Sequence, residues 1–204
     1  MIAAEASAVT ISRPCHPMIQ IVPLTGIGEV EPGAPLAGIL ADRLAALALA
    51  PFESSDILVV TQKIVSKAED RFVDLAAVHP GPEAQRLAAI TRKDPRLVEL
   101  VLAESSDILR AVPHVLITRH RSGHIMANAG IDRSNLGGRE GDLALLLPLD
   151  ADASAETLRS DLAARFGRAP AVVLADSFGR PWRMGVVGVA LGAAGLPALI
   201  DKGG

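Results

Sequence analysis

The chain has 204 residues, of which half are hydrophobic and 21% are charged, so it can bury a sizeable core and does not have the composition of a disordered segment. Aromatic residues make up only 2% and tyrosine is absent, so Ala, Leu, Val and Ile must build that core. The net charge of −3 gives no long-range attraction to nucleic acid or to an anionic membrane, and neither is expected as a partner.

The sequence contains no recognisable transmembrane segment or secretory signal. A single cysteine, Cys15, excludes an intrachain disulfide and favours a reducing compartment. The longest apolar stretch, 185–200, is interrupted by glycines and by Pro197, and residues 1–17 lack a basic region followed by an apolar one. We therefore expect a cytoplasmic protein with an N-terminal extension at 1–18 and one domain from 19 to 204.

Helical and strand patterns alternate along the chain, without internal repeats or a linker. Strands are expected at 19–24, 56–60 (of the buried type), 114–119, 124–128, 143–147 and 171–174. Helices are expected at 35–48, at 83–91, from Asp94 as N-cap with Pro95 at the first position, and at 155–166 with Ser154 as cap and Gly167 at the end. This order predicts an α+β fold, with a mixed sheet and flanking helices and without a regular doubly wound topology.

The first candidate site follows the apolar strand that runs into Asp176. A carboxylate beside the hydroxyl of Ser177 is a hard oxygen site suited to Mg²⁺ or Mn²⁺. Arg180 and Arg183 follow closely, and they could neutralise a phosphate or the carboxylate of an acidic substrate. The structural alternative is a strand that ends in an Asx-turn followed by two solvated arginines.

The second candidate site is the segment 128–135, where amides, a carboxylate and a hydroxyl surround Gly130. Asp132 is a candidate second oxygen ligand for the metal, and Asn135 is a candidate hydrogen-bond partner for a phosphate or ribose. The structural alternative is an ordinary polar loop in which Asp132 caps a short helix.

The third candidate site is the polar stretch 61–69. Lys63 and Lys67 are four residues apart and share one face of a helix, which is mildly unfavourable unless an anion lies between them. This spacing indicates phosphate binding, and the alternative is a solvated lysine face. The sequence has neither a Walker P-loop nor a GxGxxG motif, so a phosphate site must be assembled from separate loops. The histidines and Cys15 show no zinc-ligand spacing.

Taken together, these segments resemble the coenzyme F420:L-glutamate ligase family, also called F420-0:γ-glutamyl ligase. The resemblance covers residues from Ile19 to the end of the chain. The matching segments are VPLTGIG (22–28), DILVVTQKIVSKAEDR (56–71), NAGIDRSN (128–135), LLLPLDADASAETLR (145–159) and VVLADSFGRPWRMGVVGVALGAAGL (172–196).

The resemblance implies a mixed α+β fold, an intertwined homodimer, and GTP-dependent joining of L-glutamate to coenzyme F420-0 with divalent metal, with K⁺ as a further ion. The nucleotide is then expected to contact Thr25, Gly26, Ile27, Gly28, Gln62, Lys63, Lys67 and Asn135. The metals are expected at Asp132 and Asp176, with Ser177 assisting a second ion. Asp132, Asp176 and Lys67 are the expected catalytic residues, and Arg180 and Arg183 are expected to contact substrate.

The sequence departs from the family pattern at its end, because family members continue beyond the position that aligns with Gly204. The missing segment contributes to the nucleotide site and to the second metal in the family. Two other functions are therefore compatible with the same residues. One is a ligase-like protein that binds nucleotide and metal without turnover, and the other is a different metal-dependent phosphoryl-transfer enzyme, such as a hydrolase.

Overall fold

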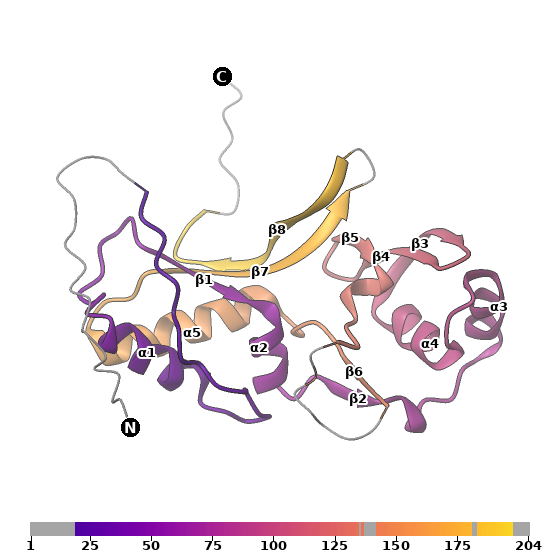
Figure 1. Ribbon diagram of the computed structural model, residues 1–204, viewed down its shortest axis with the longest axis horizontal. Coiled ribbons are helices and arrows are strands. Elements are labelled where there is room, and N and C mark those ends of the chain that lie inside the picture. Colours follow the sequence, from indigo (N-terminus) through magenta and orange to yellow (C-terminus); the bar gives the residue numbers. More distant parts are fainter. Residues whose placement is uncertain (1–18, 135, 137–141, 181–182, 198–204) are drawn as a thin grey trace, which may run out of the picture.

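The computed structural model describes residues 19–134, 136, 142–180 and 183–197, with the backbone alone at Arg180 and Arg183 (Figure 1). Two hydrophobic cores lie side by side in these residues, and each belongs to its own lobe. None of the helices in the described ranges is long and apolar enough to cross a membrane.

The first lobe packs helices against one face of a mixed three-stranded sheet. Its strands are in the order β1 (Ile57–Thr61), β7 (Ala171–Arg180) and β8 (Arg183–Ala194), with β1 parallel to β7 and β7 antiparallel to β8. Its helices are α1 (Leu36–Ala46), α2 (Gln62–Ala68) and α5 (Ala151–Phe166). The buried core includes Leu40, Leu162 and Leu174, so aliphatic side chains fill most of the space, as the composition predicts.

The second lobe combines two helices with a meander. Helices α3 (Pro82–Thr91) and α4 (Pro95–Ala103) pack on each other and on the antiparallel sheet β3 (Ser105–Val112), β4 (Val115–His120) and β5 (Ile125–Ala127). Short 3₁₀ turns η1 (Leu75–Ala77) and η2 (Asn128–Gly130) flank these elements.

A two-stranded ribbon joins the lobes, because the chain leaves the first lobe through β2 (Phe72–Asp74) and comes back through β6 (Leu143–Leu145), which pairs with β2 antiparallel. Arg71 fixes this junction. Its backbone oxygen accepts from Leu146 N at 3.0 Å, and its Nε donates to the carbonyl of Leu147 at 2.9 Å. Residues at the junction therefore belong to both lobes at once.

Most of the expected elements are confirmed. The hairpin β4–β5, helices α1 and α3, and the mixed α+β class are present. The side chain of Asp94 accepts from Arg96 N at 2.9 Å at the start of α4, and Gly167 ends α5 with φ of 76°. The sequence patterns did not indicate β2 and β3.

Three expectations about local structure are wrong. Residues 19–24 are not a strand, because no strand in the described ranges pairs with them and Ile19 and Ile21 are exposed. Helix α5 begins at Ala151, since the carboxylate of Asp150 caps it by accepting from Ala153 N at 3.0 Å, and Ser154 lies inside the helix. Strand 56–60 is not buried on both faces, because β1 alternates between buried and exposed positions.

The fourth correction concerns Asp176, which does not stand at the end of a strand. Strand β7 continues to Arg180, because β8 supplies paired backbone along its whole length, and the two form a hairpin that projects from the first lobe (Figure 1). The run 183–194 therefore forms a long antiparallel partner for the segment that contains Asp176 and Ser177.

Candidate functional site

The carboxyl end of β1 lies next to Asp176. Strand β1 pairs with β7 only as far as Thr61 and Ala175, whereas β7 continues to Asp176 and Ser177, which pair with Val189 and Gly188 of β8. Helix α2 starts at this point. In sheets with parallel strands, ligands bind in the crevice outside the carboxyl ends of the strands. The half-buried carboxylate of Asp176 and the exposed hydroxyl of Ser177 lie at such an edge.

Lys63 and Asp132 connect the two lobes at the same place. The ammonium group of Lys63, at the start of α2, forms an ion pair with Oδ2 of Asp132. Asp132 itself forms a two-way backbone bridge with Leu145, with distances of 3.0 and 2.8 Å. Because Leu145 is the last residue of β6, the position of Asp132 is set by the ribbon that joins the lobes.

Asp132 is held in its ionised form by its surroundings. Burial raises the pKa of this carboxyl group, but hydrogen bonds from Lys63 and from the backbone and hydroxyl of Ser134 outweigh burial and hold the pKa below its usual range. The Ser134 donors are 2.8 and 2.7 Å from Oδ1. Asp132 thus closes an Asx-type turn that follows the 3₁₀ turn η2 and does not cap a helix, and its role as a metal ligand stays a prediction.

The segment before Asp132 follows an unusual path. Asn128, Ala129 and Gly130 all have positive φ, at 51°, 52° and 73°. A Cβ on Gly130 would lie 2.7 Å from Sδ of Met126 and 2.8 Å from Cδ1 of Leu147, so only glycine fits. Left-handed residues other than glycine cost free energy and cluster at functional sites. This strained turn delivers Asp132 to the ribbon.

Lys67 does not share an anion with Lys63, although both lie on α2 as expected. The nearly buried ammonium group of Lys67 pairs with Oε1 of Glu29. The like charges on α2 are thus offset by two carboxylates from different parts of the chain. Glu29 directly follows the segment 25–28, so this ion pair holds the glycine turn against α2.

Within that turn, Gly26 has φ of 77°, and a Cβ there would lie 3.1 Å from Nη1 of Arg43. Thr25, Gly26 and Gly28 are exposed, and Ile27 packs against the core of the first lobe. The turn is therefore anchored through Ile27, and its other three positions are open to solvent and accessible to a ligand.

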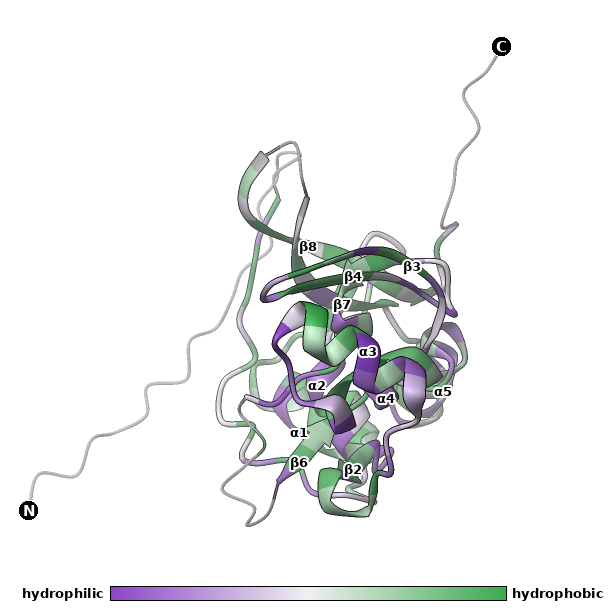
Figure 2. Ribbon diagram, turned by 90° about the vertical axis from the view of Figure 1, so that its right-hand side faces the viewer, coloured by the Kyte–Doolittle hydropathy of each residue, from purple (hydrophilic) through white to green (hydrophobic). Residues whose placement is uncertain are grey.

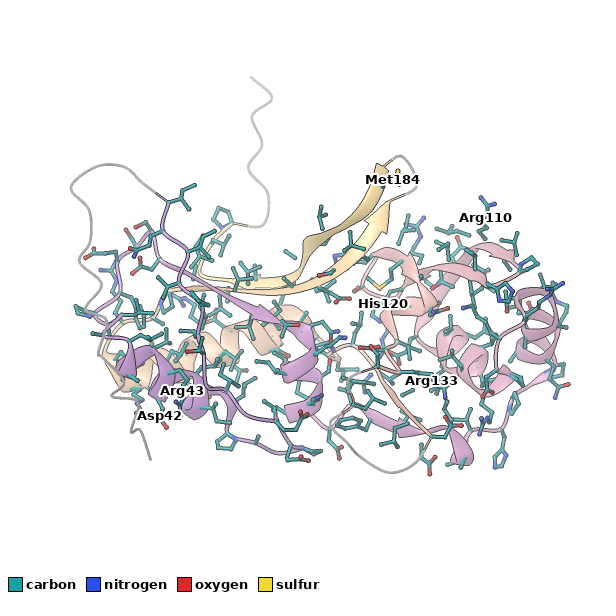
Figure 3. All side chains as sticks on the ribbon, in the orientation of Figure 1. Asp42, Arg43, Arg110, His120, Arg133 and Met184 are labelled. Atoms are coloured by element: carbon teal, nitrogen blue, oxygen red, sulfur yellow. The ribbon has the colours of Figure 1, made fainter. Side chains whose placement is uncertain are left out.

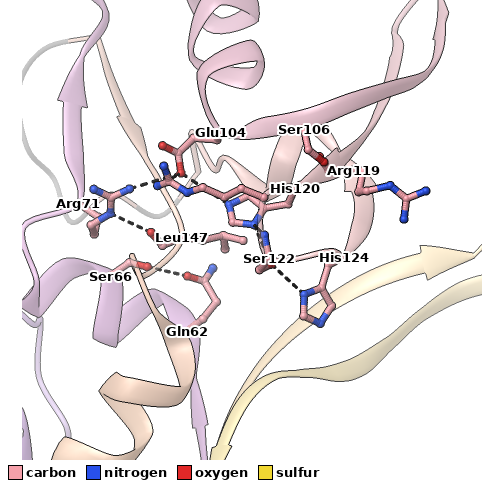
Figure 4. A network of polar contacts seen from close by, with 11 residues as sticks. Gln62, Ser66, Arg71, Glu104, Ser106, Arg119, His120, Ser122, His124 and Leu147 are labelled. Atoms are coloured by element: carbon pink, nitrogen blue, oxygen red, sulfur yellow. Dashed lines mark hydrogen bonds and ion pairs between the residues drawn. The ribbon is translucent and has the colours of Figure 1, made fainter.

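Gln62 is buried, as Lys67 is, and its amide oxygen accepts from Ser66 Oγ at 2.8 Å (Figure 4). Asn135 and the side chains of Arg180 and Arg183 lie outside the described residues. Within the described ranges, no group of three or more His, Cys, Asp or Glu side chains is arranged to hold a metal ion. The predicted donors are two carboxylates, Asp132 and Asp176, and the hydroxyl of Ser177.

The sequence patterns did not indicate a polar network behind the junction (Figure 4). Oε2 of the buried Glu104, at the end of α4, lies 2.7 Å from Arg121 Nη2, 3.4 Å from Arg71 Nη2 and 3.6 Å from Nε2 of the buried His120. Nδ1 of His120 lies 2.8 Å from Ser122 Oγ. No local pattern reveals Glu104, because its partners Arg71 and Arg121 lie 33 and 17 residues away in the chain.

This network predicts a pH dependence of stability. Burial raises the pKa of Glu104, but His120, Arg121 and Arg71 outweigh burial and lower it from its ordinary value of 4.5. The stabilisation is therefore fully present above 4.5 and is lost as pH falls through the lower folded-state pKa. At neutral pH we expect Glu104→Gln to cost about 1–3 kcal/mol, because two arginines lose their partner.

Urea titrations at several pH values between about 7 and 3 test this expectation. The difference in unfolding free energy between the wild type and Glu104→Gln should shrink as the medium becomes acidic. Glu83→Gln is the matched control, because Glu83 forms an exposed ion pair with Arg86 at 2.6 Å and should contribute little. A difference that does not change with pH would show that the charge of Glu104 is not what stabilises the junction.

The fold and the candidate site define the class as a two-lobed α+β protein in which an acidic and a basic side chain from different lobes form an ion pair. A model of the F420-0:gamma-glutamyl ligase family matches residues 26–204. The chain therefore belongs to this family of amide-forming ligases.

Three curated relatives are similar over much of the chain. The coenzyme F420:L-glutamate ligase of Methanopyrus kandleri is 40% identical over 188 residues, or 92% of this chain and 71% of that protein. The proteins of the same name from Methanothermobacter thermautotrophicus and Halobacterium salinarum are 46% and 42% identical, over 73% and 86% of this chain. The chain spans 58% and 66% of the length of these two relatives.

Proposed function

We propose that this chain catalyses, or contributes the larger part of an enzyme that catalyses, the GTP-dependent ligation of L-glutamate to coenzyme F420-0. The observation that carries the proposal is the meeting of Lys63 and Asp132 from separate lobes, at the edge of the sheet where Asp176 is located. The names of the relatives support glutamate and F420-0 as substrates.

The proposed reaction activates a carboxylate before the amide forms. A carboxylate oxygen of F420-0 attacks the γ-phosphorus of GTP, the bond from this phosphorus to the bridging oxygen breaks, and GDP leaves. The product is an acyl phosphate. The amine of glutamate then attacks the acyl carbon, the carbon–oxygen bond to phosphate breaks, and the amine nitrogen loses a proton. Positioning and electrostatic stabilisation are the main tasks of the protein in such transfers.

The residue types of the predicted donor set suit a hard divalent cation. Two carboxylates and a hydroxyl offer the oxygen ligands that Mg²⁺ and Mn²⁺ prefer, and water and phosphate oxygens commonly complete the shell of Mg²⁺. A carboxylate must be ionised to bind a metal ion, and the lowered pKa of Asp132 keeps it ionised at neutral pH. When bound, such a cation would neutralise charge on the transferred phosphoryl group. Asp132 and Asp176 would hold it, with Ser177 beside a second ion; K⁺ remains a further expectation from the resemblance.

Lys63 changes partner in this proposal. In the free protein it neutralises Asp132, and with metal and nucleotide present its ammonium group turns to a phosphate oxygen. Lys67 is neutralised by Glu29 in the free protein, so it would add positive potential to the same edge when Glu29 turns away from it. The turn 25–28, together with Gln62 and Asn135, would contact the rest of the nucleotide, and Arg180 or Arg183 an acidic substrate.

Substitution of Lys63 should therefore separate metal binding from turnover. In Lys63→Met, the carboxylate of Asp132 loses its competing cation, so we expect Mn²⁺ to bind the nucleotide-free protein about three to ten times more tightly, whereas GDP formation falls at least about a hundredfold. Calorimetry with Mn²⁺ and a GDP assay measure the two effects. Lys93→Met, on the second lobe, should change neither. Weaker Mn²⁺ binding to Lys63→Met would argue against Asp132 as a ligand.

The assay that tests the function combines purified protein, GTP, Mn²⁺, L-glutamate and F420-0. Expected are GDP in equal amount to a product heavier by one glutamate residue, and no GDP when glutamate or F420-0 is absent. Phosphate release without either substrate would instead support a hydrolase. Tight nucleotide binding with no GDP at all would support the non-catalytic binding protein. Replacing GTP with ATP in the same assay tests nucleotide choice.

A homodimer is part of this proposal, and the first lobe has a surface that it would cover. The neighbouring residues Val186 and Val187 are both exposed, so the projecting hairpin is uncovered on both faces, and Met184 at its tip is 99% exposed (Figure 3). Hydrophobic residues continue along β7 and β8 (Figure 2), and Ile57 and Val59 are exposed on β1. Contiguous apolar surface of this kind marks an interface. Sedimentation analysis measures the assembly.

A further inference from the structure

A second polar pocket lies beside the proposed ligation site. It encloses about 460 Å³ and is lined by turn residues 120–122 and His124, by segment 147–152, and by Leu191. We name it the turn pocket. A larger cavity of about 640 Å³ between α1, α2 and α5 is mainly apolar, and neither cavity is lined by Lys63, Asp132 or Asp176.

The turn pocket is connected to the ligation site through two backbone segments. Leu147, in its wall, is two residues from Leu145, the bridge partner of Asp132, and two residues of extended chain span about 7 Å. On the other side, Nε2 of His124 lies 3.2 Å from the carbonyl oxygen of Ala190, which pairs with Ala175 next to Asp176. A β-bulge at Leu191 separates this pair from the next one and places Leu191 in the pocket wall.

The walls of the turn pocket carry opposite charges. On one side is Arg121, backed by Glu104, with His124 beside it. On the other side are Asp150 and Asp152, which each use Oδ1 to accept a backbone hydrogen bond, from Ala153 N at 3.0 Å and Ala193 N at 2.8 Å. These bonds fix both carboxylates in place at the start of α5. A ligand with a carboxylate at one end and an ammonium group at the other matches this arrangement.

Hydrogen bonds within the turn hold His120, Ser122 and His124 together. His120 Nδ1 accepts from Ser122 N at 3.1 Å, so Nε2 carries hydrogen toward Glu104. Nε2 of His124 must donate to the carbonyl of Ala190. Ser122 Oγ lies 2.8 Å from Nδ1 of His120 and 3.0 Å from Nδ1 of His124, yet has a single hydrogen. Ser122 therefore links the two imidazole rings, and it fixes the position of His124 beside Arg121 in the pocket wall.

We propose that the turn pocket binds the acidic amino acid consumed in the ligation, with its carboxylates toward Arg121 and His124 and its amino group toward Asp150 and Asp152. This assignment rests on the proposed function, which requires an amino-acid acceptor close to the activated carboxylate. The pocket is large enough for a five-carbon dicarboxylic amino acid, and its polar side chains come from two separate segments, 120–124 and 150–152.

The turn tolerates side-chain changes, because backbone hydrogen bonds hold it. Arg121 N donates to the carbonyl of Glu104 at 3.0 Å, His120 N to that of His124 at 2.8 Å, and Gly123 N to that of His120 at 2.7 Å. Arg121→Gln and His124→Gln therefore test binding with the turn intact. Arg119→Gln is the matched control, since Arg119 is an exposed residue of the same hairpin and points away from the network (Figure 4).

The experiment measures the KM for L-glutamate in the GDP-release assay and the calorimetric Kd for L-glutamate in the presence of GDP and Mg²⁺. We expect both constants to rise at least about tenfold in Arg121→Gln and about three- to tenfold in His124→Gln, with the KM for GTP unchanged. Arg119→Gln should match the wild type. Circular dichroism melting shows whether each variant is folded. If Arg121→Gln is not folded, the constants of His124→Gln test the assignment.

The assignment is overturned if the two pocket variants keep the wild-type constants for glutamate, if Arg119→Gln shows an equal loss, or if the KM for F420-0 rises instead. Failure of the proposed function has a different signature. The wild-type protein would then release no GDP with glutamate and F420-0, while calorimetry with L-glutamate alone would still show whether the turn pocket binds an acidic amino acid.

Discussion

Asp132→Asn and Asp176→Asn should each lower kcat/KM for GDP formation by at least about a thousandfold, which corresponds to roughly 4 kcal/mol of transition-state stabilisation. The amide keeps the size of the side chain but removes the charge that would hold a cation beside the phosphates. In Asp132→Asn, Lys63 also loses its partner at the junction. Steady-state GDP release at saturating Mn²⁺ measures the effect.

The control for these variants is Asp107→Asn, which removes one negative charge from an exposed position on β3 of the second lobe. It should keep wild-type kinetics. Thermal melting of all three proteins separates catalysis from folding: each should unfold cooperatively, with Asp132→Asn melting somewhat lower because Lys63 loses its partner. Near-normal turnover in either Asp132→Asn or Asp176→Asn would remove that residue from the proposed metal site.

Gly192→Ala should destabilise the protein more than other glycine-to-alanine changes in β8. A Cβ at this position would lie 2.3 Å from the carbonyl carbon of Ala151, 2.5 Å from its oxygen and 2.6 Å from Asp152 N. These are backbone atoms at the start of α5 and cannot rotate away. We expect a loss of roughly 2–4 kcal/mol, and at about 2–4 °C per kcal/mol for a chain of this size, a clear drop in Tm.

Gly188→Ala is the matched control, because it lies in the same strand and a Cβ added there would meet no atom within 4 Å; its unfolding free energy should change by no more than about 0.5 kcal/mol. Urea unfolding of both variants gives the comparison. If the two substitutions cost the same, β8 and α5 do not need their direct contact. A larger loss in Gly192→Ala would confirm that this contact holds the hairpin on the first lobe.

Local chemistry made part of this fold predictable. Asp94 and Pro95 specify the start of α4, and Gly167 is the left-handed residue that ends α5. Asp150 does not stand out as a cap because Ser154 offers the same signal one turn later. The strand expected at 19–24 rests on β-branched residues alone, although a strand also needs a partner.

The candidate site was predictable in residue types but not in pairing. Lys63 and Lys67 lie on one helix as their spacing indicates, and an anion between them was the expected solution. The fold instead gives each lysine its own carboxylate. Lys63 pairs with Asp132, which lies 69 residues later in the chain, and Lys67 pairs with Glu29, which lies earlier. Glu104 gave no signal because its partners Arg71 and Arg121 belong to other segments.

The sequence by itself determined the start of α4, the end of α5, the aliphatic core, the family, and the acidic and basic residues available to the site, because propensity, capping and motif act over a few neighbouring positions. Tertiary structure decided that β7 continues past Asp176, that Gly192 touches α5, and that Lys63 meets Asp132. These contacts join residues far apart in the chain. Their geometry depends on how two lobes pack around a common ribbon, and no local pattern contains that information.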